Sequence, residues 1–223
     1  MKKAPEKFRF AAMAVDVPVF GLVGEKLYCL VSTVNRPPHY LNKFGFLGGM
    51  IKSSETAEEA VCRVLFEKGN IKDLYLEQLY TFSAVERDKR NRVVSVAYIG
   101  LVPPEKVLTY KQDEASFKPI DELSSLAYDH DEILKVSLTR LRGKLSYTTI
   151  AQFLLPKSFT LTELQTVYEI LKNTKLDKRN FRKKILALDI LKDTGKSQEG
   201  VQNRPATLYS FKSKKLEELN LVI

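Results

Sequence analysis

Residues 48–71 contain the side chains of this chain that are best placed to bind a metal ion. If the stretch is helical, positions 64, 67 and 68 share one face, because residues three and four apart are neighbours on a helix. Val64, Glu67 and Lys68 give that face one carboxylate, one apolar group and one ammonium. Magnesium needs several oxygen ligands, and Lys68 would repel the ion or pair with Glu67. We therefore expect no bound metal, no cofactor and no catalytic residue.

The same stretch nevertheless resembles the Nudix box, the loop, helix and loop that hold Mg²⁺ against a diphosphate. The box positions that this chain keeps are Gly49, Glu55, Arg63 and Glu67. The departures are Val64 and Lys68, where the box has glutamate, and Asn70, where it has glycine. The resemblance implies a Nudix fold that has lost hydrolysis. Glu55 and Arg63 are then expected to hold the loop to the helix.

The sequence around the box indicates the elements that position it. Thr56 and Glu59 form a capping box, which predicts a helix that begins there and ends at Gly69 or Asn70. Apolar segments predict strands within residues 8–34, 44–47, 74–85 and 93–102. A further amphipathic helix is predicted over residues 129–142, with His130 beside its cap.

Five residues outside the box are candidates for binding a small effector. In the fold that the resemblance implies, Arg36 and Phe44 flank the substrate cleft. Arg87, Asp88 and Arg92 lie in a charged turn between the last two predicted strands, where an anionic effector could bind. The alternative interpretation is a solvated hairpin tip and, for the phenylalanine, an ordinary core position.

Composition indicates a globular protein with excess positive charge. The chain has 223 residues, of which 44% are hydrophobic, and a net charge of +9. Residues 150–223 contain 14 Lys and Arg against 8 Asp and Glu, so the excess is concentrated in the last third. This distribution favours a polyanionic partner, with a solvated lysine-rich surface as the alternative.

Nothing in the sequence indicates a membrane protein. No apolar run approaches the ~20 residues of a membrane span. The basic N-terminus is not followed by the apolar segment of a signal peptide. Cys29 and Cys62 are expected to be buried thiols of a reducing compartment. We therefore expect a cytoplasmic protein.

The basic last third has the pattern of two short helices joined by a turn. Thr160 and Glu163 form a second capping box, and Asp177 is a suitable N-cap for the next helix. That second helix places Phe181 and Ile185 on one face and basic residues opposite, in its N-terminal half. The helix dipole disfavours cations there. A DNA recognition helix has this arrangement because its N-terminal turns meet bases and phosphates.

A glycine-containing loop and a strand at residues 206–211 complete the order of a winged helix, with residues 193–211 as the wing. The candidate DNA contacts are Thr162, Lys178, Arg179, Asn180, Arg182, Lys183 and Arg204.

Together with the degenerate box, residues 155–165, 177–184 and 204–209 resemble the Nudix-related transcriptional regulators over nearly the whole chain. The resemblance implies an α+β fold. A Nudix mixed β-sheet sandwich at residues 1–146 would bind an effector and supply dimer contacts. A winged helix-turn-helix domain at residues 147–223 would bind DNA.

The resemblance also implies a mode of action. Members of that family are homodimers on near-palindromic operators, usually repressors, and they sense ADP-ribose or a sugar such as arabinose. A Nudix hydrolase of ADP-ribose or a related nucleoside diphosphate, with an appended basic domain, is the main alternative. An RNA-binding adaptor is a third, which depends on charge alone.

Overall fold

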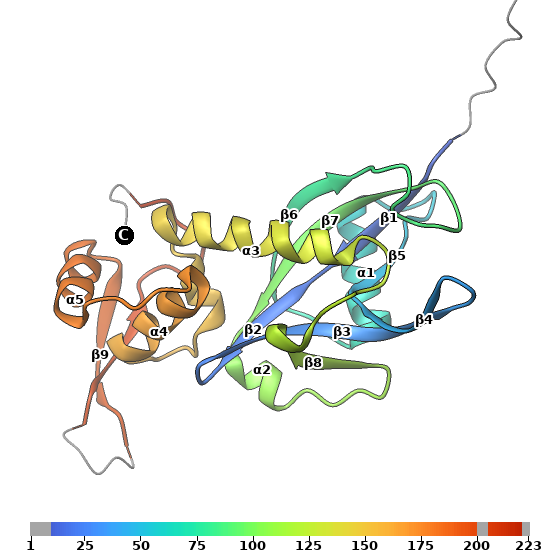
Figure 1. The fold of residues 1–223 in the computed structure, drawn as a ribbon. Coiled ribbons are helices and arrows are strands. Elements are labelled where there is room, and N and C mark those ends of the chain that lie inside the picture. Colours follow the sequence, from blue (N-terminus) through green and yellow to red (C-terminus); the bar gives the residue numbers. More distant parts are fainter. Residues whose placement is uncertain (1–9, 200–204, 220–223) are drawn as a thin grey trace, which may run out of the picture.

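The computed structural model describes residues 10–199 and 205–219. Within them, the first part of the chain forms an eight-stranded mixed sheet (Figure 1). Its strands are β1 (Ala12–Val17), β2 (Val19–Val23), β3 (Lys26–Arg36), β4 (Tyr40–Gly45), β5 (Leu47–Met50), β6 (Tyr75–Phe82), β7 (Val93–Val102) and β8 (Ala115–Pro119). The main order is β4-β3-β2-β7-β1-β5, with β6 paired to β7 and β8 paired to β3. β7 runs parallel to β1 and β2, whereas the other pairs are antiparallel.

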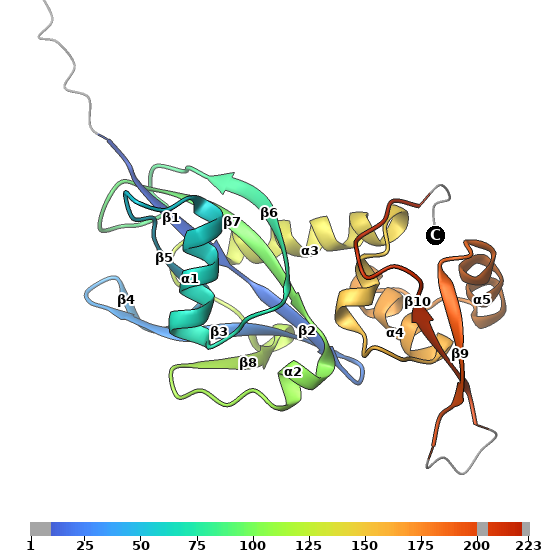
Figure 2. The ribbon, with the colours of Figure 1, turned by 180° about the vertical axis from the view of Figure 1, so that it is seen from behind.

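Helices cover both faces of this sheet, as the two opposite views show (Figures 1 and 2). Helix α1 (Ala57–Gly69) lies on one face and buries Val61, Val64 and Leu65. The longer helix α3 (His130–Tyr147) lies on the other face. The short helix α2 (Pro104–Leu108) and a 3-10 helix (Ile120–Glu122) flank β8. The sheet is therefore the middle layer between two apolar cores.

Local capping signals set the ends of α1. The Thr56 side chain accepts the N–H of Glu59, and the Glu59 carboxylate accepts the N–H of Thr56. The helix ends at Asn70, whose φ of 46° lies in the left-handed region that Asn tolerates. Both predicted ends of this helix are confirmed.

The last part of the chain is a winged helix. It contains a 3-10 helix (Ile150–Leu154), α4 (Leu161–Lys172), α5 (Lys178–Ala187), β9 (Leu191–Ser197) and β10 (Thr207–Phe211). β9 and β10 pair antiparallel as the wing. Phe159 and Tyr209 exchange backbone hydrogen bonds of 2.9 and 2.7 Å, so the strand segment before α4 extends this small sheet.

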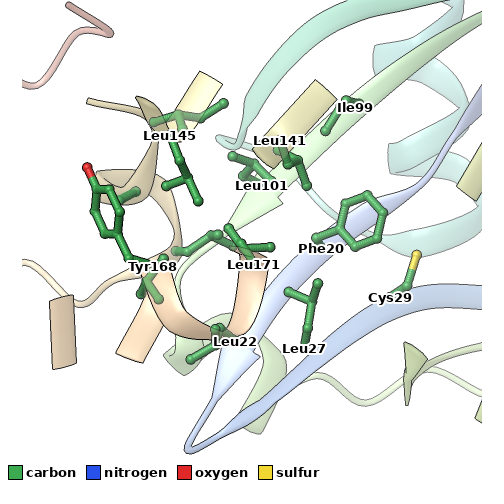
Figure 3. Packing of buried hydrophobic residues seen from close by; sticks show 14 of the residues in the cluster. Phe20, Leu22, Leu27, Cys29, Ile99, Leu101, Leu141, Leu145, Tyr168 and Leu171 are labelled. Atoms are coloured by element: carbon green, nitrogen blue, oxygen red, sulfur yellow. The ribbon is translucent and has the colours of Figure 1, made fainter. Parts of the chain in front are cut away.

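One apolar cluster runs from the sheet into the winged helix. Leu22 and Leu27 of the sheet, Leu141 of α3, and Tyr168 and Leu171 of α4 belong to it (Figure 3). Residues 143–158, between the two parts, are packed and do not form a flexible tether: α3 continues through Tyr147, and the 3-10 helix that follows buries Ile150, Ala151 and Leu154. The two parts therefore pack against each other without a solvated joint.

The α+β class is confirmed, and two local expectations are wrong. The charged turn at residues 86–92 is not wholly a solvated hairpin tip, because Arg87 and Asp88 are buried, at 5% and 7% exposure, although its other residues are exposed. Cys29 is buried as expected, but Cys62 is exposed on α1. None of the helices in residues 10–199 and 205–219 combines the length and apolar character that a membrane span requires.

Candidate effector cavity and nucleic-acid interface

A cavity of about 740 Å³ opens where the Gly-Gly turn, α1 and the start of α3 meet. Its volume lies within the range of ~300–1,000 Å³ of small-molecule sites. The charged and aromatic residues that line it are Asp16, Arg36, Phe46, Lys68, Arg87, Asp88, Arg90, Asp113, Glu114, Tyr128 and His130. Residues of the degenerate box and of the charged turn therefore share one site with residues from β1 and α3.

A buried ion-pair network forms one side of the cavity. The Arg87 guanidinium donates to Asp16 at 2.9 Å and to both carboxylate oxygens of Asp129 at 2.7 and 2.9 Å. Burial raises the pKa of Asp16, but His130 and the charge of Arg87 outweigh that effect and hold it well below its usual range. Asp16 is therefore an anion that stays ionised to low pH, and Arg87 is committed to structure.

His130 joins this network in one defined tautomer. Its Nδ1 accepts the backbone N–H of Phe46 at 2.9 Å, so the ring proton must be on Nε2. Nε2 faces the Asp16 carboxylate at 3.3 Å. His130 directly follows the N-cap Asp129, as predicted, and it is also a buried residue between the first turn of α3, β1 and the segment before β5.

The box residues that this chain keeps link α1 to the loop before it. Arg63 donates to both oxygens of Glu55, at 2.6 and 2.8 Å, and to the carbonyl of Met50 at 3.0 Å. These bonds and the backbone N–H of Lys52 lower the pKa of Glu55 to about 2. Arg63 also pairs with Glu67 at 3.1 Å. Glu55 and Arg63 therefore hold the loop to α1, as predicted.

The box does not fit a magnesium ion. Val64 is fully buried and packs beneath Gly49, where an added Cβ would lie 3.0 Å from it. Lys68 donates to the Gly48 carbonyl instead of pairing with Glu67, which corrects that expectation. Among the residues described, no group of three or more His, Cys, Asp or Glu side chains is arranged to hold a metal. Magnesium requires such oxygen ligands in a near-octahedral shell.

The cavity includes three of the five predicted effector residues. Arg36, Arg87 and Asp88 line it, but Arg87 is occupied by the network above and Asp88 pairs with Arg90. Phe44 lies on β4 outside the lining, with Lys118 over its ring at 5.9 Å. Arg92 is also outside, because its guanidinium donates to carbonyls at the end of β6. The structure therefore does not bring Phe44 and Arg92 into this cavity.

Sequence reasoning missed an aromatic wall beside the cavity. The Tyr40 and Tyr128 rings lie 4.4 Å apart, and the Arg90 guanidinium lies 5.3 Å from the Tyr128 ring. Arg90 is held there by two hydrogen bonds to Asp88, at 2.8 and 3.0 Å. No local signal links these residues, because Tyr40 and Tyr128 meet only through the fold. A flat, π-faced group is the natural contact for such a wall.

The second candidate site is the exposed face of α5. Asp177 caps the helix by accepting the N–H of Asn180 at 2.8 Å. Phe181 and Ile185 turn inward, and Phe181 packs edge-on against Tyr168. The outward positions are Lys178, Arg179, Asn180, Lys183 and Lys184, all of them exposed. The free N–H groups of a helix N-terminus add to the attraction that these cations have for phosphates.

Thr162 and Arg182 are brought together across the helix–turn–helix. Arg182 is half-buried, and its Nη2 lies 3.5 Å from the Thr162 hydroxyl at the start of α4. Lys192 and Lys196 of β9 are exposed on the wing, and sequence reasoning named neither of them nor Lys184 as contacts. Lys184 lies in the predicted recognition helix and Lys196 in the predicted wing, whereas Lys192 directly precedes the predicted wing. Arg204 lies outside the described residues.

Comparison with known proteins identifies both parts. A family model described as "NrtR DNA-binding winged helix domain" matches residues 151–211. The "ADPR responsive transcriptional repressor NtrR" of Acinetobacter baylyi is 30% identical over 209 residues, or 89% of this chain and 81% of that protein. The ADP-ribose pyrophosphatase of Methanocaldococcus jannaschii is 31% identical over 60% of this chain and 79% of its own length.

Solved structures of Shewanella oneidensis NrtR give the same result. Its complex with a 27mer DNA is 30% identical, covers 90% of this chain and 93% of that one, and superimposes with a TM-score of 0.80. Its Nudix domain in complex with ADP ribose is 26% identical, covers 62% of this chain and 93% of that one, and has a TM-score of 0.51. The chain belongs to the Nudix-related transcriptional regulators, in which a Nudix domain precedes a DNA-binding winged helix.

Proposed function

We propose that this chain is a homodimeric, non-hydrolytic repressor that binds a near-palindromic operator in the cytoplasm and is controlled by ADP-ribose. Residues 1–146 bind the effector and supply the dimer contacts, and residues 147–223 bind DNA. The observation that carries the proposal is the basic, outward face of α5. The winged helix that contains α5 shares one apolar core with the sheet domain, and the sheet domain contains a cavity of the size of a small effector.

Helix α5 is the element that reads the operator. Its N-terminal half presents Arg179, Asn180 and Lys183 to solvent, while Phe181 anchors the opposite face. Arginine is suited to bidentate contact with guanine, and lysine to phosphate. One winged helix contacts too few base pairs to select a single site in a genome. Two copies bound to paired half-sites would double the number of base pairs contacted, so we expect a dimer.

Replacing basic residues of α5 tests this role, with a duplex that the full chain selects from a random pool and a scrambled duplex as probes. Arg182→Ala is expected to cost roughly 1–3 kcal/mol on the selected duplex only, if Arg182 contacts a base. Lys183→Ala is expected to weaken both duplexes equally and to reduce the salt slope by about one. Fluorescence anisotropy at several salt concentrations measures both effects.

Lys135→Ala is the matched control, because Lys135 is an exposed lysine of α3 that lies outside the winged helix. It should leave both affinities unchanged. Thermal melts of Lys135→Ala and Lys183→Ala should match the parent because both side chains are exposed, whereas Arg182→Ala also removes the half-buried contact with Thr162. If Arg179, Arg182 and Lys183 can all be replaced by alanine with no loss of affinity, α5 is not the reading element.

ADP-ribose suits the cavity better than a neutral sugar. Arg36 and Lys68 line it, and no carboxylate in the described residues forms an ion pair with either. A diphosphate would use both cations, and a flat base would lie against Tyr128 and Arg90, the two members of the aromatic wall that line the cavity. A neutral sugar such as arabinose offers hydroxyl groups for hydrogen bonds, but it has no anion to pair with the two cations and no flat base. The relatives described above include one named for its response to ADP-ribose.

Helix α3 couples the two sites. Its first residue, His130, lines the cavity, and its N-cap, Asp129, binds Arg87 at the cavity wall. Its last turns hold the winged helix, where Arg142 donates to the carbonyl of Leu171 at 2.8 Å and Leu145 is buried. Eighteen helical residues span about 27 Å as one rigid element. A ligand that shifts the first turn of α3 would therefore change the placement of α5 relative to its partner copy.

Hydrolysis of ADP-ribose is expected to be absent, because the box lacks a carboxylate cluster that could hold magnesium. The assay incubates the full chain with ADP-ribose and Mg²⁺ and follows the release of AMP. Turnover near the ordinary enzyme median of ~10 s⁻¹ would favour the hydrolase interpretation instead. The pyrophosphatase relative makes this the measurement that separates the two candidate functions.

A further inference from the structure

The positive charge beside the turn between β5 and α1 comes from a side chain of the protein, Lys68. Lys68, in the last turn of α1, reaches back to the carbonyl oxygen of Gly48, and both residues line the cavity. Gly48 itself lies against β1, where an added Cβ would be 2.1 Å from the Asp16 carboxylate, so no residue with a side chain fits at this position. A carbonyl oxygen exposed at a cavity wall is a ligand for a hard cation. In this chain the Lys68 ammonium group donates a hydrogen bond to that carbonyl oxygen, in the place where a metal ion would bind.

The carboxylates of the box are already in use. Arg63 and the N–H of Lys52 occupy the oxygens of Glu55. Glu67 turns to Arg63 and is half exposed, with 51% of its side chain in solvent. The Glu59 carboxylate caps α1. Arg63 is thus committed to Glu55 and Glu67 and lies outside the cavity lining, whereas Lys68 is a cation that binds the Gly-Gly turn and lines the cavity.

We propose that Lys68 takes the place of a divalent metal, so that the cavity binds the diphosphate of its effector as the metal-free anion. The ammonium on Gly48 and the guanidinium of Arg36 supply the positive charge that a magnesium ion would otherwise supply. Free ADP-ribose, and not its magnesium complex, is then the form that is recognised. The inference rests on the proposed binding of ADP-ribose in this cavity.

Isothermal titration of the full chain with ADP-ribose tests the proposal in EDTA and in excess Mg²⁺. The parent protein is expected to bind at least as tightly in EDTA as in Mg²⁺. Lys68→Met should weaken binding roughly 10- to 100-fold in EDTA, the usual loss when a charged partner of a phosphate is removed. Lys52→Met removes an equal charge from the exposed loop outside the cavity lining and should change nothing. Binding that needs Mg²⁺, or full affinity in Lys68→Met, overturns the proposal.

A second arm uses no effector, so that it remains decisive if ADP-ribose does not bind at all. Mn²⁺ is titrated into the effector-free chain and its free fraction is followed by electron paramagnetic resonance. The parent is expected to bind no ion at this turn, whereas Lys68→Glu should gain one. Mn²⁺ bound at the turn of the parent, or no gain in Lys68→Glu, overturns the role of Lys68. Absence of ADP-ribose binding together with the expected Mn²⁺ results would instead refute the proposed effector.

Discussion

Phe181→Ala is expected to destabilise the chain by about 3–5 kcal/mol, the cost of removing a buried aromatic ring from a packed core. Phe181 is 4% exposed and its ring lies 5.3 Å from that of Tyr168, which is itself almost fully buried. Together with the neighbouring buried residue Ile185, Phe181 packs α5 against α4. Its loss leaves a cavity beneath the recognition helix and should therefore also abolish operator binding. Denaturant unfolding followed by circular dichroism measures the loss of stability.

Leu186→Ala is the matched control for this change. Leu186 lies one turn further along α5, but almost half of its side chain is exposed, so its truncation should cost less than about 1 kcal/mol. A loss below 1 kcal/mol for Phe181→Ala would mean that α5 is not anchored through this ring. The packing of Phe181 could then no longer be used as evidence that the basic face of α5 points outward.

Arg87→Met is expected to cost about 3–5 kcal/mol at neutral pH, because it leaves the buried Asp16 and the partly buried Asp129 without their shared partner. The Arg87 side chain is 3% exposed, and its guanidinium bridges Asp16 on β1 and Asp129 at the start of α3. Lys89→Met in the same turn removes an exposed charge that has no ion pair among the described residues, and should change stability by less than ~0.5 kcal/mol.

The pH dependence of Arg87→Met tests the same network by its sign. The pKa of Asp16 is lower in the folded state than in the unfolded state. Asp16 therefore contributes to the free energy of unfolding above the unfolded-state pKa of ~3.9, and this contribution is lost as the pH falls below it. In the variant, Asp16 is buried beside fewer stabilising charges and gains from protonation. The stability difference between the parent and Arg87→Met should therefore narrow as the pH is lowered below about 4. A difference that widens in acid would contradict the account.

The parts of the structure that the sequence predicts are those that local rules determine. Thr56 and Glu59 are three residues apart, as are Thr160 and Glu163, and each pair closes its capping box in the structure. The inward turn of Phe181 and Ile185 follows from their helical spacing. Such signals need no knowledge of which elements become neighbours, so α1, α4 and α5 were placed correctly.

The cavity could not be predicted in the same way because its residues are distant in the sequence. Asp16 meets Arg87 across 71 positions, and His130 meets the backbone of Phe46 across 84. The charged turn looked solvated because its buried partners come from β1 and α3. Val64 shares a helical face with Glu67 by spacing alone, yet the packing of α1 on the sheet buries one and exposes the other. Only the tertiary fold determines these environments.

The central claim is that ADP-ribose in the cavity controls DNA binding by α5. The most direct test is fluorescence anisotropy of the selected duplex, titrated with the full chain alone, with ADP-ribose and with arabinose. The account predicts two chains per duplex and an affinity that ADP-ribose lowers by about 5- to 150-fold, the usual range of allosteric coupling, while arabinose has no effect. An affinity that saturating ADP-ribose leaves unchanged, or one that only arabinose lowers, would contradict it.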